Sequence, residues 1–269
     1  MRAVSTVADT LVFLLLVSAA VATLVVSPSA PTPPRADPTA ETLATTTLSV
    51  PLQATDGTDH QRTASGTPAG LLGRAALANA TLDGRRLLPG SFPRRVALAV
   101  HDARPVANVR VVARWRPYPG ASLSGRVAAG SPAPRDAVTD VAVVTVPSGI
   151  ALDTDRARAA ADDGFRPLAR TVAERFVARL FPPGAGRSNL GTDAARARTA
   201  PRYRRFAAVV GAEVRGPLAN RSATTARDRL ADALAARLTT DMRRRFESPR
   251  RAAAALTLDT VRLAVVRWR

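Results

Sequence analysis

The sequence contains no cysteine and no lysine, and it has few aromatic residues. The lack of cysteine excludes disulfides, thiolate nucleophiles and cysteine-ligated zinc sites. Aromatic residues make up 4% of the chain, whereas the whole hydrophobic fraction is 46%. We therefore expect a globular core of small aliphatic side chains, stabilised by packing alone.

Motifs for catalysis or cofactor binding are also lacking. The two histidines, His60 and His101, have no close partners of the kind that a metal site or a catalytic triad needs. The glycine-rich residues 184–191 contain no lysine and match neither a phosphate-binding loop nor a dinucleotide-binding turn. We predict no catalytic residue, no metal and no cofactor, and we expect a protein that is not an enzyme. An exported enzyme without a readable motif is the alternative.

Positive charge is abundant, because all 39 basic residues are arginine and the net charge is +18. Such a charge attracts anionic lipid, acidic glycans, acidic proteins or nucleic acid. Since no nucleic-acid-binding module accompanies the arginines, an acidic surface polymer is favoured over nucleic acid. The candidate anion-binding residues come from two dense clusters: Arg202, Arg204, Arg205, Arg243, Arg244 and Arg245.

The first 26 residues form the longest apolar stretch, in which residues 10–26 carry no charge and an extension back to residue 3 adds only Asp9. This length predicts a transmembrane anchor over residues 1–26. A secretory signal cleaved near Ala22 is the alternative, and either segment would export the remainder. The charges beside the stretch predict a cell-membrane protein with its N-terminus inside and its domain outside. Prolines follow at once, so residues 27–41 are predicted to be a linker and residues 42–269 an external domain.

The domain changes from strand-like to helical periodicity along the chain. In residues 106–116, Val109 and Trp115 share one predicted strand face, while arginines that include Arg110 and Arg114 share the other. Residues 117–134 are predicted to be turns. Other strands are predicted over 43–52, 140–146 and 256–268, and helices over 69–82, 92–104, 153–181, 201–218 and 224–246. Within 153–181, Gly164 and Pro167 are expected to break or bend the helix near its start. The expected fold is α+β, with an N-terminal transmembrane helix, a proline-rich linker and a small antiparallel sheet covered by several amphipathic helices.

Two Asn-X-Ser/Thr triplets fit an external domain. They begin at Asn79 and Asn220 and make these residues candidate glycosylation sites.

Residues 2–7, Arg-Ala-Val-Ser-Thr-Val, precede the aliphatic stretch directly. This arrangement resembles the N-terminus of haloarchaeal type IV pilin-like proteins, and the whole chain resembles an uncharacterised haloarchaeal membrane-protein family. The resemblance implies that Arg2 and Ala3 flank a processing site and that Asp9 makes an assembly contact.

These observations favour a non-enzymatic, membrane-anchored surface protein, such as an accessory or minor subunit of a pilus-like assembly. Its expected partners are membrane lipid and other pilin-like subunits. The alternative is an exported, arginine-rich binding module for acidic glycans or surface-layer protein.

Overall fold

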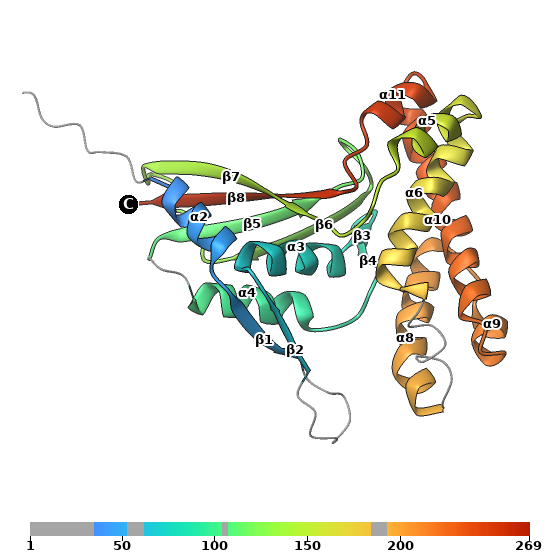
Figure 1. The fold of residues 1–269 in the computed structure, drawn as a ribbon, viewed down its shortest axis with the longest axis horizontal. Helices are drawn as coiled ribbons and strands as arrows, with labels where there is room; N and C mark the ends of the chain where they lie inside the picture. The colour runs from blue at the N-terminus through green and yellow to red at the C-terminus, as the bar shows by residue number, and fades with distance from the viewer. Residues whose placement is uncertain (1–34, 53–61, 104–106, 184–192) are drawn as a thin grey trace, which may run out of the picture. The chain divides into compact units, whose positions relative to one another are not determined.

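The computed structural model describes residues 35–52, 62–103, 107–183 and 193–269, and Figure 1 shows their arrangement. Six antiparallel strands form the main sheet in the order β4-β3-β6-β5-β8-β7. The C-terminal strand β8 lies within the strand predicted over 256–268, and it pairs with both β5 and β7. The strand bounds are Thr81–Leu82 (β3), Arg85–Arg86 (β4), Val109–Trp115 (β5), Leu123–Ala129 (β6), Thr139–Pro147 (β7) and Thr260–Trp268 (β8).

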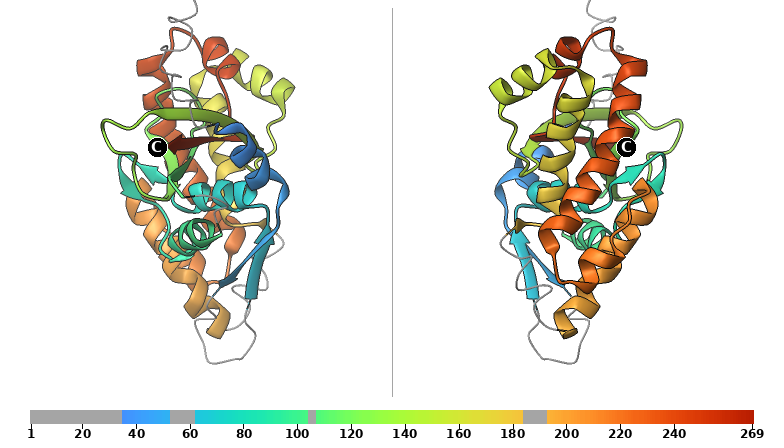
Figure 2. Two further views of the ribbon diagram at one scale, coloured as in Figure 1. Left: turned by 90° about the vertical axis from the view of Figure 1, so that its left-hand side faces the viewer. Right: turned by 90° about the vertical axis from the view of Figure 1, so that its right-hand side faces the viewer.

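Two helices, α3 (Pro68–Ala78) and α4 (Phe92–Asp102), lie against one face of this sheet (Figures 1 and 2). The predicted inner face of β5 is confirmed, because every odd-numbered residue from Val109 to Trp115 points toward α3 and α4 and is buried. At Gly125 of β6, a Cβ atom would lie 2.2 Å from the backbone oxygen of Ala76 in α3. Only glycine permits this close approach. The prediction of turns over 117–134 is therefore wrong, since β6 lies within that range.

The helices from α5 to α11 form a bundle beside one end of the sheet (Figure 1). The predicted helix over 153–181 is divided into α5 and α6 at Gly164, whose φ is +117°. The predicted helix over 201–218 instead begins at Asp193 and contains Pro201. The bundle helices are α5 (Thr154–Asp162), α6 (Phe165–Leu180), α8 (Asp193–Val210), α9 (Arg215–Ala219), α10 (Ala223–Arg245) and α11 (Pro249–Ala254).

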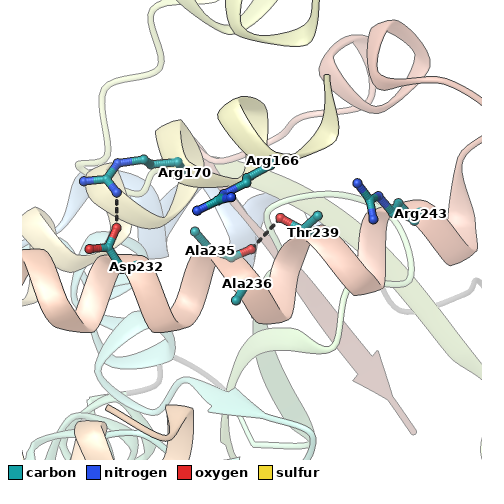
Figure 3. Close-up of a pocket in the computed structure, with 7 residues that line it drawn as sticks. All are labelled: Arg166, Arg170, Asp232, Ala235, Ala236, Thr239 and Arg243. Carbon is teal, nitrogen blue, oxygen red and sulfur yellow. Dashed lines mark hydrogen bonds and ion pairs between the residues drawn. The ribbon is translucent and has the colours of Figure 1, made fainter. Parts of the chain in front are cut away.

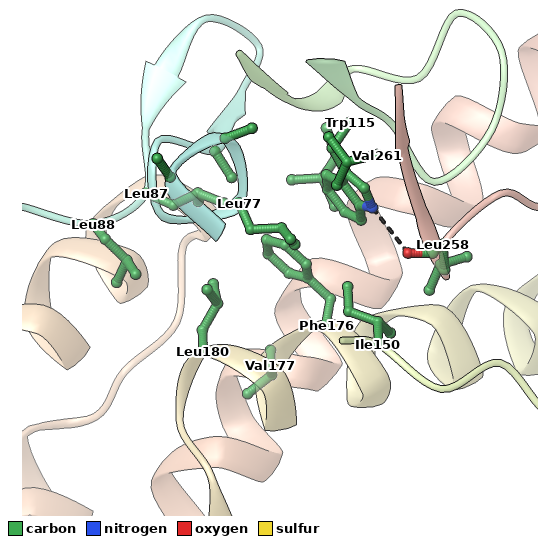
Figure 4. Close-up of a cluster of buried hydrophobic side chains, with 14 of the residues drawn as sticks. Leu77, Leu87, Leu88, Trp115, Ile150, Phe176, Val177, Leu180, Leu258 and Val261 are labelled. Atoms are coloured by element: carbon green, nitrogen blue, oxygen red, sulfur yellow. Dashed lines mark hydrogen bonds between the residues drawn. The ribbon is translucent and has the colours of Figure 1, made fainter. Parts of the chain in front are cut away.

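Aromatic side chains join the sheet to this bundle (Figure 4). The Trp115 ring at the end of β5 stacks on Phe176 of α6, with ring centroids 5.1 Å apart. The Trp115 indole N–H donates a hydrogen bond to the Leu258 oxygen at 3.0 Å. Phe206 of α8 extends the cluster, its centroid lying 6.4 Å from that of Phe176. One continuous core therefore includes side chains of the sheet and of the bundle.

The N-terminal part of the domain differs from its prediction. Helix α2 (Asp37–Thr45) occupies residues assigned to the linker and to the strand over 43–52. Its buried residues Ala40 and Leu43 join the core, and this tertiary contact outweighs the strand propensity of the neighbouring threonines. The strand β1 (Leu48–Leu52) follows and pairs with β2 (Arg62–Gly66) in a separate two-stranded sheet.

The expected architecture also needs a correction. The domain is α+β with antiparallel sheets. Across residues 35–52, 62–103, 107–183 and 193–269, however, no helix has the length and apolar character needed to cross a membrane. The transmembrane helix predicted over residues 1–26 lies outside the described residues. Within the described residues the fold is therefore an α+β domain in which no helix could span a membrane.

Candidate anion-binding surface

Three arginines lie side by side on the face of the main sheet that is opposite α3 and α4. Arg114 of β5 pairs with Arg126 of β6 on one side and with Arg262 of β8 on the other. Neighbouring strands are about 4.8 Å apart, so the three side chains leave the sheet at adjacent positions. We call Arg114, Arg126 and Arg262 the arginine row, and all three are exposed.

The arginine row has no acidic partner among the residues that the structure describes. Like charges placed directly opposite each other on adjacent strands repel and destabilise a sheet. A bound carboxylate, sulfate or phosphate would reduce this repulsion, and a guanidinium group can bind each of these groups through two parallel hydrogen bonds. The row is thus a surface whose charge favours an anionic ligand.

A pocket of about 470 Å³ adjoins the row. Arg114, Arg116 and Arg262 supply its positive charge, while Thr257 and Thr260 add hydroxyl groups. The Thr257 hydroxyl donates to the Arg116 oxygen at 3.1 Å and so fixes the end of β5. The pocket therefore offers cationic and hydroxyl groups from one face of the sheet.

An apolar row lies beside the arginines. Val112 of β5 pairs with Ala264 of β8, which pairs in turn with Val143 of β7. Val143 is 55% exposed. On the same face, the Nε of Arg110 is buried and has no hydrogen-bond partner in the described part of the chain. The open face thus combines apolar and cationic groups.

Two of the predicted arginines of α8 hold this helix to its neighbours, one to α6 and one to β4. Arg202 donates to the Leu180 oxygen at 3.3 Å and lies over the Phe181 ring, and burial lowers the pKa of its guanidinium group. Arg205 donates to the Arg86 oxygen at 3.0 Å. Arg204 is exposed. Two of these three candidates therefore have structural partners.

The predicted arginines at the end of α10 point to different surroundings. Arg245 pairs with buried Asp241, with 3.1 Å between Nε and Oδ1. Asp241 also accepts hydrogen bonds from the Tyr118 hydroxyl at 2.9 Å and from the Ser122 N–H at 3.1 Å. Burial, together with the Asp241 charge, raises the pKa of Tyr118 above its usual range. The charge of Arg245 is thus already balanced, whereas Arg243 and Arg244 are exposed.

Arg243 lines a groove of about 630 Å³ between α6 and α10 (Figure 3). At one end of the groove Arg170 pairs with Asp232 and Glu174, and these contacts, chiefly the hydrogen bond to Glu174, raise the pKa of Arg170. Arg166 and Arg243 have no acidic partner within the described ranges. The groove is a second cationic site, and its positive charge is partly cancelled by the two carboxylates.

Other predicted sites stay predictions. Arg2, Ala3 and Asp9 lie outside the described residues. The Asn79 side-chain amide donates to the Arg126 oxygen at 2.7 Å, so it is engaged by β6, whereas Asn220 is exposed at the end of α9. Over the part of the chain that the structure describes, no group of three or more His, Asp or Glu side chains could hold a metal ion.

The sequence predicts only part of the arginine row. The alternation in residues 106–116 places Arg114 on the open face, and the same alternation around Arg262 is a signal that could have identified it. Arg126 lies in the strand that was predicted as turns. The strand register that brings the three together is non-local and cannot be read from spacing.

Comparison with known proteins identifies one family. A family model described as a family of unknown function (DUF7284) matches residues 8–268. No curated protein and no solved structure matches the chain.

Proposed function

The chain belongs to this family of unknown function, and we propose that it is a non-enzymatic binding module whose arginine row holds an acidic polysaccharide. The observation that carries the proposal is that Arg114 lies in register with Arg126 and Arg262 on an open face, where none of the three has an ion-pair partner among the described residues. The export predicted from the N-terminal sequence would place this face among surface polymers.

The groups around the row favour a polysaccharide over other polyanions. Thr145 and Thr260 flank Arg262 and can hydrogen-bond to sugar hydroxyls, while Val143 and Ala264 offer apolar contact to a sugar ring. Single-stranded nucleic acids are usually held by exposed aromatic side chains. The large hydrophobic residues exposed in the described domain are Leu98 and three valines, with no aromatic among them. Carboxylated or sulfated sugars are therefore the ligand class that this chemistry fits.

Replacing Arg114, Arg126 and Arg262 together by glutamine should weaken binding to immobilised polygalacturonate by roughly ten- to a hundredfold, because each exposed ionic contact contributes up to about 1 kcal/mol. Binding of the unaltered protein should also weaken as salt is raised, because ions screen exposed charges. The measurement is the bound fraction across a salt series.

A matched control removes the same amount of charge elsewhere. Arg158, Arg250 and Arg251 are exposed, and each pairs with a carboxylate, at distances of 2.9, 2.8 and 3.3 Å. Their triple glutamine variant should bind polygalacturonate nearly as well as the unaltered protein. Equal losses in both variants would show that net charge alone matters, and tighter binding to single-stranded polynucleotide than to polygalacturonate would overturn the choice of ligand.

The N-terminal resemblance to haloarchaeal pilin-like proteins supports a second candidate, an accessory or minor subunit of a pilus-like assembly. Residues 2–7 carry it, directly before the family match begins at residue 8. Pilin-type processing should leave Ala3 as the first residue of the mature protein. N-terminal sequencing measures this, and an intact Met1 or a new start near Ala22 would contradict it.

A further inference from the structure

The strand β7 forms one edge of the main sheet, and part of its backbone points away from the sheet. In an antiparallel pair, alternate residues exchange hydrogen bonds with the neighbouring strand. The Ser148 N–H donates to the Asp259 oxygen at 2.7 Å, whereas the Val141 N–H donates at 2.9 Å to the Asp140 carboxylate. The even-numbered residues therefore face β8, and Val141, Val143 and Thr145 direct their N–H and C=O groups outward.

This outward edge is open over only a short stretch. Before it, the Asp140 carboxylate accepts a hydrogen bond from the Ala36 N–H at 2.6 Å. After it, Pro147 has no N–H to donate. In the described part of the chain, no other segment forms a hydrogen bond with the backbone of Val143 or Thr145. Unpaired edge groups of this kind readily accept another strand.

The β7 edge also differs in charge from the rest of the protein. Although the net charge is +18, β7 contains no arginine, and its one charged residue is Asp140. Val141 and Val143 are 53% and 55% exposed and present β-branched side chains, which pack well across neighbouring strands. A second β7 can therefore approach this edge without placing arginine against arginine.

We infer that a second copy of this chain pairs its β7 with this edge, antiparallel and about a two-fold axis at Val143. Val143 then lies opposite Val143 of the second copy, and Val141 lies opposite Thr145 in both directions. The stretch from 141 to 145 is centred on Val143, so its outward groups match those of the second copy, except that the Val141 N–H is already bonded to the Asp140 carboxylate. An interface of this symmetry closes at two copies and does not propagate.

The pairing goes beyond the proposed function and does not depend on it. A two-fold axis normal to the sheet places both open faces on the same side, so the two arginine rows face one way. Measured across the strands, the two Arg114 positions lie five strand spacings, or about 24 Å, apart. A five-residue edge buries less than the roughly 1,000 Å² of a stable interface, so we expect a weak, concentration-dependent dimer. A polymer that spans both rows would favour the dimer through avidity.

Sedimentation velocity of the full chain over a wide concentration range tests the inference. We expect reversible association that stops at two copies. Val143→Pro should weaken it at least roughly tenfold, because proline removes an outward N–H and leaves the hydrogen bonds to β8 in place. Val143→Thr keeps the N–H and should dimerise like the unaltered protein. Leu98→Ser, on the 52%-exposed residue of α4, should also have no effect if association is specific to β7.

Val143→Lys is a second test that keeps the backbone donor and places two ammonium groups face to face at the axis. It should also be monomeric, and circular dichroism of each variant checks that the fold is intact. A monomer at every concentration, growth beyond two copies, or a dimer insensitive to both substitutions would overturn the inference. The variant lacking the arginine row should still dimerise, which separates this result from a failure of polysaccharide binding.

Discussion

Asp241→Ala is expected to lower the free energy of unfolding by about 3 kcal/mol, the cost of breaking a buried ionic and hydrogen-bonded cluster. Asp241 is 7% exposed and accepts hydrogen bonds from Tyr118, Ser122 and Arg245. Removal of the Asp241 carboxylate leaves the Tyr118 hydroxyl and the Ser122 N–H without an acceptor. It also leaves the partly buried guanidinium group of Arg245 without its ion-pair partner. Urea denaturation at neutral pH measures the loss.

Two controls define this effect. Tyr118→Phe removes one donor and keeps the ring, so it should cost about 1 kcal/mol. Asp232→Ala breaks the ion pair with Arg170 on the exposed side of α10 and should cost less than about 1 kcal/mol. If Asp241→Ala were no more destabilising than Asp232→Ala, the cluster would not link the Tyr118–Ser122 segment to α10 in the way the hydrogen bonds indicate.

The same cluster explains why the predicted anion site at the end of α10 is not one site. Successive residues on an α-helix point about 100° apart, so neighbours in sequence face different surroundings. Arg243 lines the groove against α6, while Arg245 pairs with Asp241. Clustering of arginines along a helical sequence therefore predicts the charge of a region but not a shared binding surface.

The alternation of residues in a strand predicts which side chains share a face of the sheet, but it does not predict which strands pair with each other. The alternation in β5 correctly separates the buried side, including Trp115, from the arginine side. In the sequence, Gly125 is typical of a turn. In the structure it lies in β6, where the close approach of α3 leaves no room for a side chain. Which strands flank β5 depends on contacts between distant segments, so the arginine row emerges only from the register.

Local propensity also predicts the wrong secondary structure where tertiary packing determines the conformation. The threonine-rich residues before β1 favour a strand, yet burial of Ala40 and Leu43 makes most of them part of α2. Pro201 is expected near a helix start, but α8 contains it in its interior. Burial of Tyr203 and Phe206 on the following turn holds this helix against the core.

Trp115→Ala should be the most destabilising core substitution of those considered, lowering the free energy of unfolding by about 3–5 kcal/mol. Trp115 is 1% exposed, and its ring stacks on Phe176 at an interplanar angle of 11° (Figure 4). Trp115→Phe keeps an aromatic ring and should cost much less. The Leu258 oxygen loses the indole donor in that variant, but it still accepts a hydrogen bond from the Ser148 hydroxyl at 2.6 Å.

Trp115→Ala also tests whether the sheet and the bundle unfold together, because the Trp115–Phe176 contact joins them. The chain has two tryptophans, so the variant retains only Trp268 on β8, and its fluorescence reports on the sheet. Far-ultraviolet circular dichroism reports chiefly on the helices, most of which lie in the bundle. Since one core includes both parts, we expect the two transitions in urea to coincide at a lower midpoint than in the unaltered protein. Separate midpoints would mean that the Trp115–Phe176 contact alone makes the main sheet and the bundle unfold together.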